Sequence, residues 1–290
     1  MTTIPILDGL RAIAGRYDGF ILDLWGVIHD GATAYPGAAD TLAALRAAGK
    51  RVVLLSNAPR RAAPLVEGMR AMGIPRDLYD SVLSSGEVVH DELIARTDPW
   101  FAALGPRCLH IGPERDRNVL EGVAAELVDH PALADWVLNT GPVSLDETVA
   151  DYEAPLAACA ARGLPMVCAN PDIEVIREGR RLTCAGALAK RYQALGGEVG
   201  WRGKPDPAVY RASLDQLGLE APRVLVIGDA LHTDVAGAEA AGIDALLITG
   251  GIHAEELGTV WGDPPDPARL DALAAKHGHR PVAALPAFRW

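Results

Sequence analysis

Short apolar runs alternate along this chain with stretches in which apolar residues recur every three or four positions. The runs at 20–24, 51–55, 223–227 and 244–248 are typical of strands buried on both faces. The stretches with helical periodicity predict helices at 38–48, 62–72, 207–217 and 233–241. Strands that alternate with helices in this way predict a doubly wound α/β core with a parallel sheet.

The long stretch between these two sets of elements must contain structure of its own, because connections of that length are rarely structureless. Its strand candidates are 107–111, 136–139 and 166–169, and its helix candidates are 87–95, 114–121 and 145–162. We predict a discontinuous core of residues 1–81 and 182–260, an inserted α/β cap domain of residues 82–181, and a C-terminal extension of residues 261–290. The helix at 186–195 is expected to be the first core helix after the cap.

The strand predicted at 223–227 leads directly into two carboxylates, Asp229 and Asp234. Open parallel sheets bind ligands at the carboxyl ends of their strands. Two acids at that edge suit a hard cation such as Mg²⁺. An Asp before a helix is also a common N-cap. The residues that follow the other predicted strands are therefore needed to distinguish a metal site from a cap.

Polar residues follow two further predicted strands, and a lysine lies in a loop bounded by prolines. Asp23 closes the first strand, Ser56 and Asn57 follow the second, and Lys204 precedes Pro205. Together these segments supply a nucleophilic carboxylate, a hydroxyl and a cation for phosphate oxygens, and acids for a metal. Phosphoryl transfer through an aspartyl-phosphate requires this set of groups.

In this order the segments resemble the four motifs of the haloacid dehalogenase (HAD) superfamily. The likeness is strongest to subfamily IIA, the phosphatases with a large α/β (C2) cap, which include 4-nitrophenylphosphatase-like, nucleotide and pyridoxal-phosphate phosphatases. Further segments typical of that branch are Gly26-Val27, Gly31, Ser84-Ser85-Gly86, Asn170-Pro171-Asp172 and Gly186-Ala187-Leu188. The resemblance covers about residues 18–253.

The resemblance implies a role for each motif residue. Asp23 would attack phosphorus, and Lys204 would offset the repulsion between Asp23 and the phosphoryl group. Ser56 and Asn57 would bind phosphoryl oxygens. The implied Mg²⁺ site consists of Asp23, the backbone carbonyl of Trp25, Asp229 as a direct ligand, and Asp234, which would orient a bound water or Lys204.

Trp25 departs from the pattern of that branch, which has a second aspartate at this position as the general acid/base. General acid–base catalysis contributes about 10²–10⁴-fold, so the tryptophan favours substrates with good leaving groups. His29 and Asp30 lie close by in sequence and either replace the acid or belong to the turn.

The leading functional hypothesis is Mg²⁺-dependent hydrolysis of small phosphomonoesters. The alternative is a metal- and phosphate-binding sensor or scaffold with vestigial turnover, which Trp25 favours. A dehalogenase or a phosphonate hydrolase has less support. Dehalogenases lack the acid pair that this chain keeps in Asp229 and Asp234.

Substrate contacts are expected from the predicted cap. Asn170 and Asp172 lie in a loop after a strand, and the resemblance implies that this loop faces the substrate. Trp25 is a further substrate-contact candidate from the core. His110, at the end of another cap strand, is a weaker one, because a histidine there is more often structural.

The composition narrows the range of partners. With 49% hydrophobic and 22% charged residues the chain is an ordinary globular protein, and its net charge of −11 argues against nucleic acid or an anionic membrane as a partner. We see no signal peptide and no apolar run near the roughly 18 residues of a span. The cysteines are scattered and fit a reduced, cytoplasmic setting as small core residues. We expect a small phosphorylated metabolite as partner, and a homodimer remains open.

Overall fold

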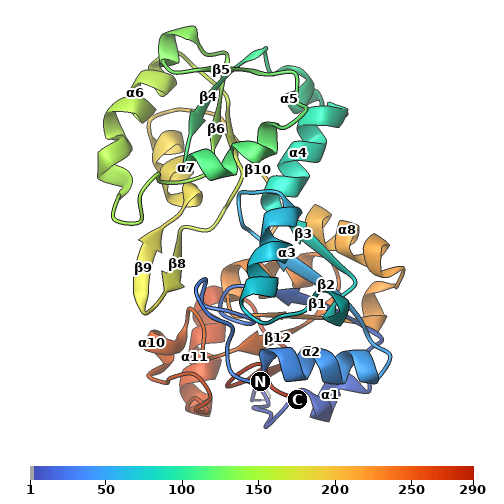
Figure 1. The fold of residues 1–290 in the computed structure, drawn as a ribbon. Coiled ribbons are helices and arrows are strands. Elements are labelled where there is room, and N and C mark those ends of the chain that lie inside the picture. The colour runs from blue at the N-terminus through green and yellow to red at the C-terminus, as the bar shows by residue number, and fades with distance from the viewer. Residues whose placement is uncertain (1–2) are drawn as a thin grey trace.

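A six-stranded parallel sheet forms the lower body of the molecule in the computed structural model, which describes residues 3–290 (Figure 1). Its strands are β1 (Gly19–Asp23), β2 (Arg51–Ser56), β3 (Ser81–Ser84), β11 (Val224–Gly228), β12 (Asp244–Ile248) and β13 (Ala283–Leu285). They lie in the order β13-β12-β11-β1-β2-β3, and every pairing is parallel. All six carboxyl ends therefore meet at one edge of the sheet.

Alternate residues of the central strands face opposite layers of helices. Phe20 and Leu22 of β1 pack with one layer, and Ile21 packs with the other. The first layer contains α1 (Arg11–Ala14), α2 (Ala38–Ala47) and α3 (Ala62–Ala71). The second contains α8 (Pro207–Leu217), α9 (Ala236–Ala240), α10 (Ala254–Leu257) and α11 (Pro267–His277). Because both faces are covered, the strands read as continuous apolar runs, and the predicted α/β fold is confirmed.

A second, five-stranded parallel sheet forms the upper body (Figure 1). Its strands are β4 (Arg107–Ile111), β5 (Glu126–Val128), β6 (Trp136–Asn139), β7 (Met166–Cys168) and β10 (Val199–Trp201), in the order β10-β7-β6-β4-β5. One face packs against α4 (Ser85–Ala95) and α5 (Pro99–Ala102), and the other against α6 (Glu153–Ala161) and α7 (Ala185–Ala194).

A two-stranded antiparallel hairpin extends from the upper body toward the lower one (Figure 1). It consists of β8 (Glu174–Arg177) and β9 (Arg180–Thr183). Arg181 of β9 donates a hydrogen bond of 2.8 Å to Glu255 of α10. The hairpin therefore touches the lower body on the side where α10 lies.

The prediction that the helix at 186–195 belongs to the core was wrong. Leu188 and Tyr192 of α7 pack among apolar residues of the upper sheet, and β10 pairs with β7 in that sheet. A helix packs where its apolar face is covered, and local periodicity does not say which sheet covers it. The second sheet therefore extends to Trp201, beyond the residue 181 that we predicted as the cap limit.

The C-terminal extension of residues 261–290 is part of the lower body. It contains α11, and β13 pairs with β12 at the edge of the six-stranded sheet. Ile6, near the N-terminus, bridges to Ala284 of β13. The tail thus closes this edge of the sheet together with the start of the chain.

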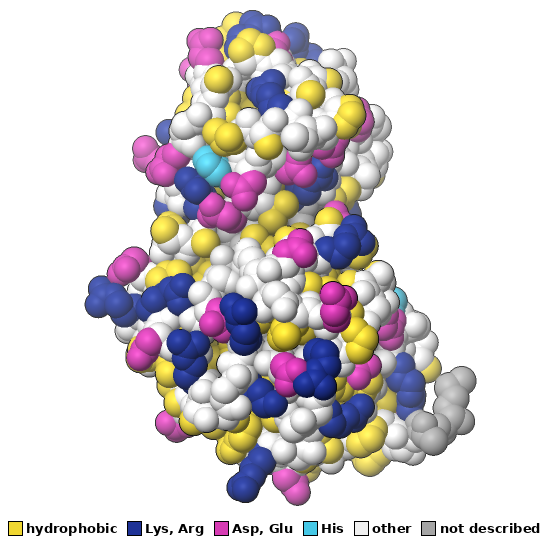
Figure 2. Space-filling model, turned by 90° about the vertical axis from the view of Figure 1, so that its right-hand side faces the viewer, with side chains coloured by type: hydrophobic (Ala, Val, Ile, Leu, Met, Phe, Trp, Pro, Cys, Tyr) yellow, Lys and Arg dark blue, Asp and Glu magenta, His cyan; other side chains and the backbone are white. Residues whose placement is uncertain are grey.

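The charged surface and the buried cysteines are those of an ordinary globular protein, as the composition predicted. On the face shown in Figure 2, acidic and basic side chains are interspersed. Within residues 3–290, no helix is both long and apolar enough to cross a membrane. The four cysteines are free and buried, as expected for core residues.

Candidate active site

Three acids from two motifs converge at the carboxyl edge of the six-stranded sheet. β1 and β11 are neighbours, so Asp23 at the end of β1 lies beside the loop that follows β11. Asp229 directly follows β11, and Asp234 lies in the helical turn Leu231–Val235 that comes next. One ligand oxygen from each of the three acids lies within 4.8 Å of the others. All three side chains are buried. The structure therefore brings together the acids that the sequence analysis selected.

Lys204 lies between two of these acids. Its Nζ is 2.8 Å from Asp23 Oδ1 and 2.7 Å from Asp234 Oδ1, and only 3% of the residue is exposed. Burial alone would lower the pKa of Lys204, but Asp23 and Asp234 raise it well above its ordinary value. The lysine therefore remains charged.

Asp23 keeps one side-chain oxygen fixed. The N–H of Leu24 donates to its Oδ1 at 2.7 Å, and Lys204 approaches the same oxygen. Within the described residues these interactions all involve Oδ1, so Oδ2 is the oxygen left to face the site. A carboxylate held in this way is oriented for reaction.

A glycine and a backbone N–H group enclose the carboxylate of Asp229. Ile252 N–H donates to its Oδ2 at 2.7 Å. Gly26, with a φ of +73°, passes so close that a Cβ there would overlap the same carboxylate. A residue with a side chain would be strained in this conformation and would also displace Asp229. This close approach explains why glycine stands at position 26.

The acids carry more negative charge than the lysine offsets. Burial raises the pKa of Asp23 well above its usual range, and burial followed by the charge of Asp234 raises the pKa of Asp229 to about 7. Asp172, from the cap loop, is a further acid whose pKa burial raises. A divalent cation would remove this excess, and an all-oxygen donor set suits Mg²⁺. The residues present therefore fit the metal that the family resemblance implies.

Ser56 and Asn57 differ in how their side chains are used. Ser56 is buried, and its Oγ accepts a hydrogen bond from Ala58 N–H at 3.2 Å, so it can still donate. Asn57 accepts the N–H of Lys204 at 2.7 Å and donates to Asp172 at 2.7 Å and to the Lys204 carbonyl at 3.3 Å. Its amide therefore links the loop of Lys204 to the loop of Asp172. Phosphate binding by Asn57 stays a prediction.

Trp25 forms a wall of the site. Its indole packs edge-on against the His29 ring, with 5.5 Å between centroids, and lies so close to Gly31 that a Cβ there would overlap it. His29 is buried, and its Nδ1 accepts the N–H of Gly31 at 3.0 Å. This packing ties the tryptophan to the turn that follows the nucleophile candidate.

Two cavities, of about 410 Å³ and 390 Å³, flank Asp23 between the two bodies. Asp23, Trp25 and Asp172 line both of them, and Lys204 lines the first. Each is large enough for a small ligand. The second cavity is also lined by Asn170, Ser56, Asn57 and three arginines, Arg60, Arg115 and Arg177.

His110, the remaining substrate-contact candidate from the predicted cap, forms a hydrogen bond within the upper body. The Nε2 of His110 is hydrogen-bonded to Thr140 Oγ1 at 2.8 Å. This contact favours the structural interpretation of His110 over a role in substrate binding.

The sequence analysis missed several residues of this site. Ile252, in the loop after β12, donates to Asp229, and the hydroxyl of Tyr210 donates to the carbonyls of Thr233 and Asp234 at 3.0 and 3.2 Å. Tyr35 and Trp261 stack at 3.7 Å and line the first cavity. The glycine pair at the carboxyl end of the 244–248 strand was a signal for that loop, because it lies at the same edge as the acids.

Two family models match the chain. The haloacid dehalogenase-like hydrolase model covers residues 20–126, and a HAD-hydrolase-like model covers residues 201–277. A solved haloacid dehalogenase-like hydrolase from Brucella suis 1330 is 38% identical, with a TM-score of 0.82, over 97% of this chain and 98% of that one. The chain belongs to the haloacid dehalogenase-like hydrolases. The matched ranges contain all five motif residues, namely Asp23, Ser56, Lys204, Asp229 and Asp234.

More distant relatives of this HAD hydrolase have names that point to its phosphatase branch. A p-nitrophenyl phosphatase from Archaeoglobus fulgidus is 26% identical, with a TM-score of 0.70, over 93% of this chain and 96% of that one. Human chronophin is 26% identical over 84% of both chains. The family resemblance stated from the motifs is therefore confirmed, and the chain is a HAD-type phosphatase by class.

Proposed function

We propose that this chain hydrolyses small phosphomonoesters in the presence of Mg²⁺, with Asp23 as the nucleophile. The observation that carries the proposal is the buried cluster in which Lys204 lies between Asp23 and Asp234, with Asp229 beside them. Such a cluster costs folding free energy, because several acids share one cation. A catalytic role accounts for a cluster that stability alone does not favour. The direct test is release of phosphate from an aryl phosphate with and without Mg²⁺.

In the first half of the proposed reaction, a carboxylate oxygen of Asp23 attacks phosphorus in line. The bond from phosphorus to the leaving oxygen breaks, and an aspartyl-phosphate forms. Lys204 offsets the repulsion between the attacking carboxylate and the phosphoryl oxygens, and the hydroxyl of Ser56 donates to one of those oxygens. When bound, Mg²⁺ supplies positive charge for the phosphoryl group.

In the second half, water attacks the aspartyl-phosphate at phosphorus. Inorganic phosphate leaves, and the carboxylate of Asp23 is restored while the proton of water passes to solvent. The residues that would hold Mg²⁺ are Asp23, Asp229, Asp234 and the backbone carbonyl of Trp25. The indole N–H of Trp25 is far too weak an acid to protonate the leaving oxygen, so we infer that good leaving groups react best.

The cap loop and the hairpin choose the substrate in this proposal. Asp172 and Val175 line both cavities, so a substrate bound at Asp23 would contact the upper body. We assign this role to the predicted cap of residues 82–181, together with α7. Four buried free thiols suit a reducing compartment, and we therefore propose the cytoplasm as the location.

Asp229→Asn is expected to weaken Mg²⁺ binding with little effect on the fold. The amide keeps the shape but loses the charge that favours a divalent cation. The Mg²⁺ concentration for half-maximal turnover should rise by at least about tenfold, and excess Mg²⁺ should restore part of the activity. Turnover measured against Mg²⁺ concentration checks this. Asp263→Asn, at an exposed acid of the same body, is the control, and full activity of the Asp229 variant in EDTA would contradict the metal assignment.

Trp25→Asp is expected to raise turnover of alkyl phosphates more than that of aryl phosphates. An acid near the leaving oxygen helps poor leaving groups most, with a ceiling of about 10²–10⁴-fold, and a grafted acid without supporting contacts should fall well short of it. The measurement is kcat/KM on an alkyl and an aryl phosphate for both proteins.

Trp25→Asn is the matched control, because it opens the same space beside His29 and Gly31 without adding an acid. A gain seen equally with Asn would come from space alone. Equal losses on both substrates in the Asp variant would instead make Trp25 a structural or substrate-contact residue.

A further inference from the structure

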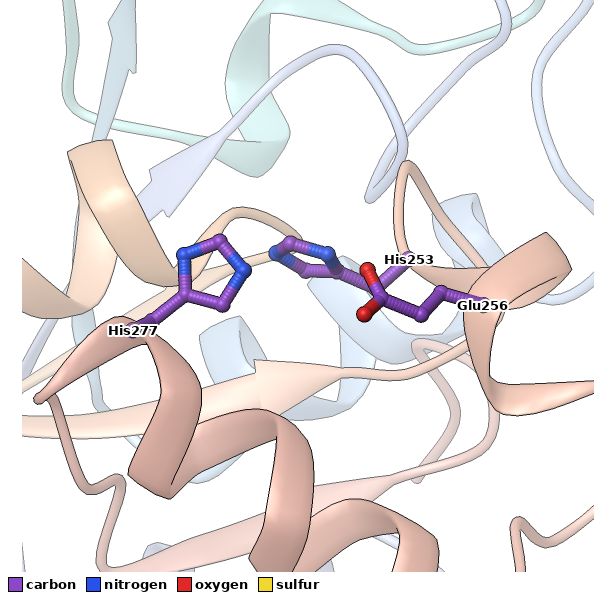
Figure 3. A group of neighbouring side chains, drawn as sticks. All are labelled: His253, Glu256 and His277. Carbon is purple, nitrogen blue, oxygen red and sulfur yellow. The ribbon is translucent and has the colours of Figure 1, made fainter.

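Three histidines and a glutamate meet beside the loop that carries Asp229 and Asp234. His253 precedes α10, Glu256 lies in α10, and His277 ends α11 (Figure 3). The ring centroids of His253 and His277 are 5.0 Å apart. The ring of His232, in the helical turn after β11, stacks on that of His277 with 6.0 Å between centroids. The proposed phosphatase mechanism uses none of these four residues.

The geometry of the cluster is that of a ligand set. One ligand atom from each of His253, Glu256 and His277 lies within 4.8 Å of the others. Figure 3 shows a ring nitrogen of His277 directed toward the His253 ring. Tetrahedral ligands of zinc lie about 3.3 Å apart, given bonds of about 2.0–2.2 Å. His277 is half-buried and Glu256 is exposed. Small rotations of these two side chains can therefore bring the ligand atoms to the shorter separation that zinc requires.

The protonation of the cluster also suits a metal. Burial, followed by the charges of His277 and His232, lowers the pKa of His253 to about 4. Burial and His232 also lower the pKa of His277. These shifts favour the neutral ring, which is the form that binds metal. Glu256 is paired through Oε1 with Lys276 at 2.6 Å, and its second oxygen remains for an ion.

We propose that His253, Glu256 and His277 form a binding site for a borderline divalent metal of the zinc class. Two imidazoles and one carboxylate select zinc, nickel or copper over magnesium, which prefers oxygen alone. The site is separate from the all-carboxylate cluster around Asp23. Its exposed edge at Glu256 gives an ion access from solvent.

A hydrogen bond joins this second site to the segment that carries Asp229 and Asp234. Leu231 N–H donates to His253 Nε2 at 3.1 Å, and Leu231 lies between Asp229 and Asp234. In a neutral ring the accepting nitrogen holds the free lone pair. A metal at Nε2 therefore competes with Leu231 N–H, releases the loop and lowers turnover.

The test is calorimetric titration of the full chain with Zn²⁺ in saturating Mg²⁺. We expect one tight binding event that persists in Asp229→Asn. His277→Gln and Glu256→Gln should each weaken it by at least about tenfold. His279→Gln, two residues beyond the cluster, is the matched control and should leave binding unchanged. Thermal melting of each variant confirms that it is folded.

Two results would overturn the site. Either wild type shows no such event, or the event is retained in both His277→Gln and Glu256→Gln. Loss of the event in Asp229→Asn alone would assign Zn²⁺ to the carboxylate cluster instead. These outcomes do not depend on phosphatase activity, so they separate failure of this site from failure of the proposed function.

The coupling has its own measurement. At saturating Mg²⁺, Zn²⁺ should lower turnover of wild type and His279→Gln by several-fold and leave His277→Gln unaffected. Equal inhibition of all three proteins, or binding of Zn²⁺ through His277 without any change in turnover, would overturn the coupling.

Discussion

Asp23→Asn is expected to lower kcat on an aryl phosphate by at least about 10⁴-fold, because it removes the attacking carboxylate. The amide has nearly the same shape and still accepts the N–H of Leu24. It also removes one negative charge from a cluster in which Asp23, Asp229 and Asp234 share a single lysine. The loss should therefore appear in catalysis and not in stability.

The measurement combines single-turnover kinetics with acid-quench trapping of a phosphorylated protein. Wild type should accumulate acid-stable label during turnover, and Asp23→Asn should not. Ser56→Ala is the comparison at the same edge of the sheet and should lose much less, since it removes one hydrogen-bond donor. Turnover by Asp23→Asn near the wild-type rate would exclude the aspartyl-phosphate mechanism.

Lys204→Met is expected to impair both activity and stability. Breaking a buried ion pair by removing one partner costs about 3–5 kcal/mol, because the remaining charges stay buried without compensation. Here Asp23 and Asp234 would both lose the cation that lies 2.8 and 2.7 Å away. Turnover should fall by at least about 10³-fold, since the repulsion between Asp23 and phosphate is no longer offset.

The stability loss should depend on pH with a defined sign. Without Lys204, the buried carboxyl groups have pKa values raised above their unfolded values, so the folded state binds more protons than the unfolded state. The free energy of unfolding then falls as pH rises. The deficit relative to wild type should be largest near neutral pH and shrink as pH approaches about 4, the unfolded carboxyl value.

Urea unfolding at several pH values measures this deficit, without Mg²⁺ and with it. Mg²⁺ should recover part of the loss. Lys276→Met is the matched control, because that lysine pairs with Glu256 at the exposed surface. A Lys204 variant as stable as the control at every pH would show that Lys204 does not compensate the charge of the buried acids.

The motif residues were predictable because of one regularity of α/β sheets. Buried parallel strands have continuous apolar runs, and their carboxyl ends lie at one edge, so polar residues directly after such runs must be neighbours. Asp23 and Asp229 follow runs of this kind, and β1 lies next to β11. The α/β fold and the meeting of these acids with Lys204 could therefore be inferred before any contact was known.

Elements with short or ambiguous patterns could not be assigned in the same way. The periodicity of α7 shows that it has an apolar face, yet only packing shows that the upper sheet covers this face. The three-residue strand β13 is too short to stand out from a loop, and its pairing with β12 brings the tail into the core sheet. The local sequence shows that a helix has an apolar face, but it does not show which element covers that face.

The sequence by itself predicted the groups of the candidate site, since an acid, a hydroxyl, a lysine and an acid pair follow one another along the chain in that order. Tertiary structure alone decided that the Asn57 amide bonds Asp172 and Lys204, and that Trp25 lines both cavities. It also brought His253 and His277 together, from positions with no shared motif. The physical reason is the range of the interactions. Strand and helix patterns arise from neighbours along the chain, whereas side-chain contacts between distant segments depend on how the layers pack.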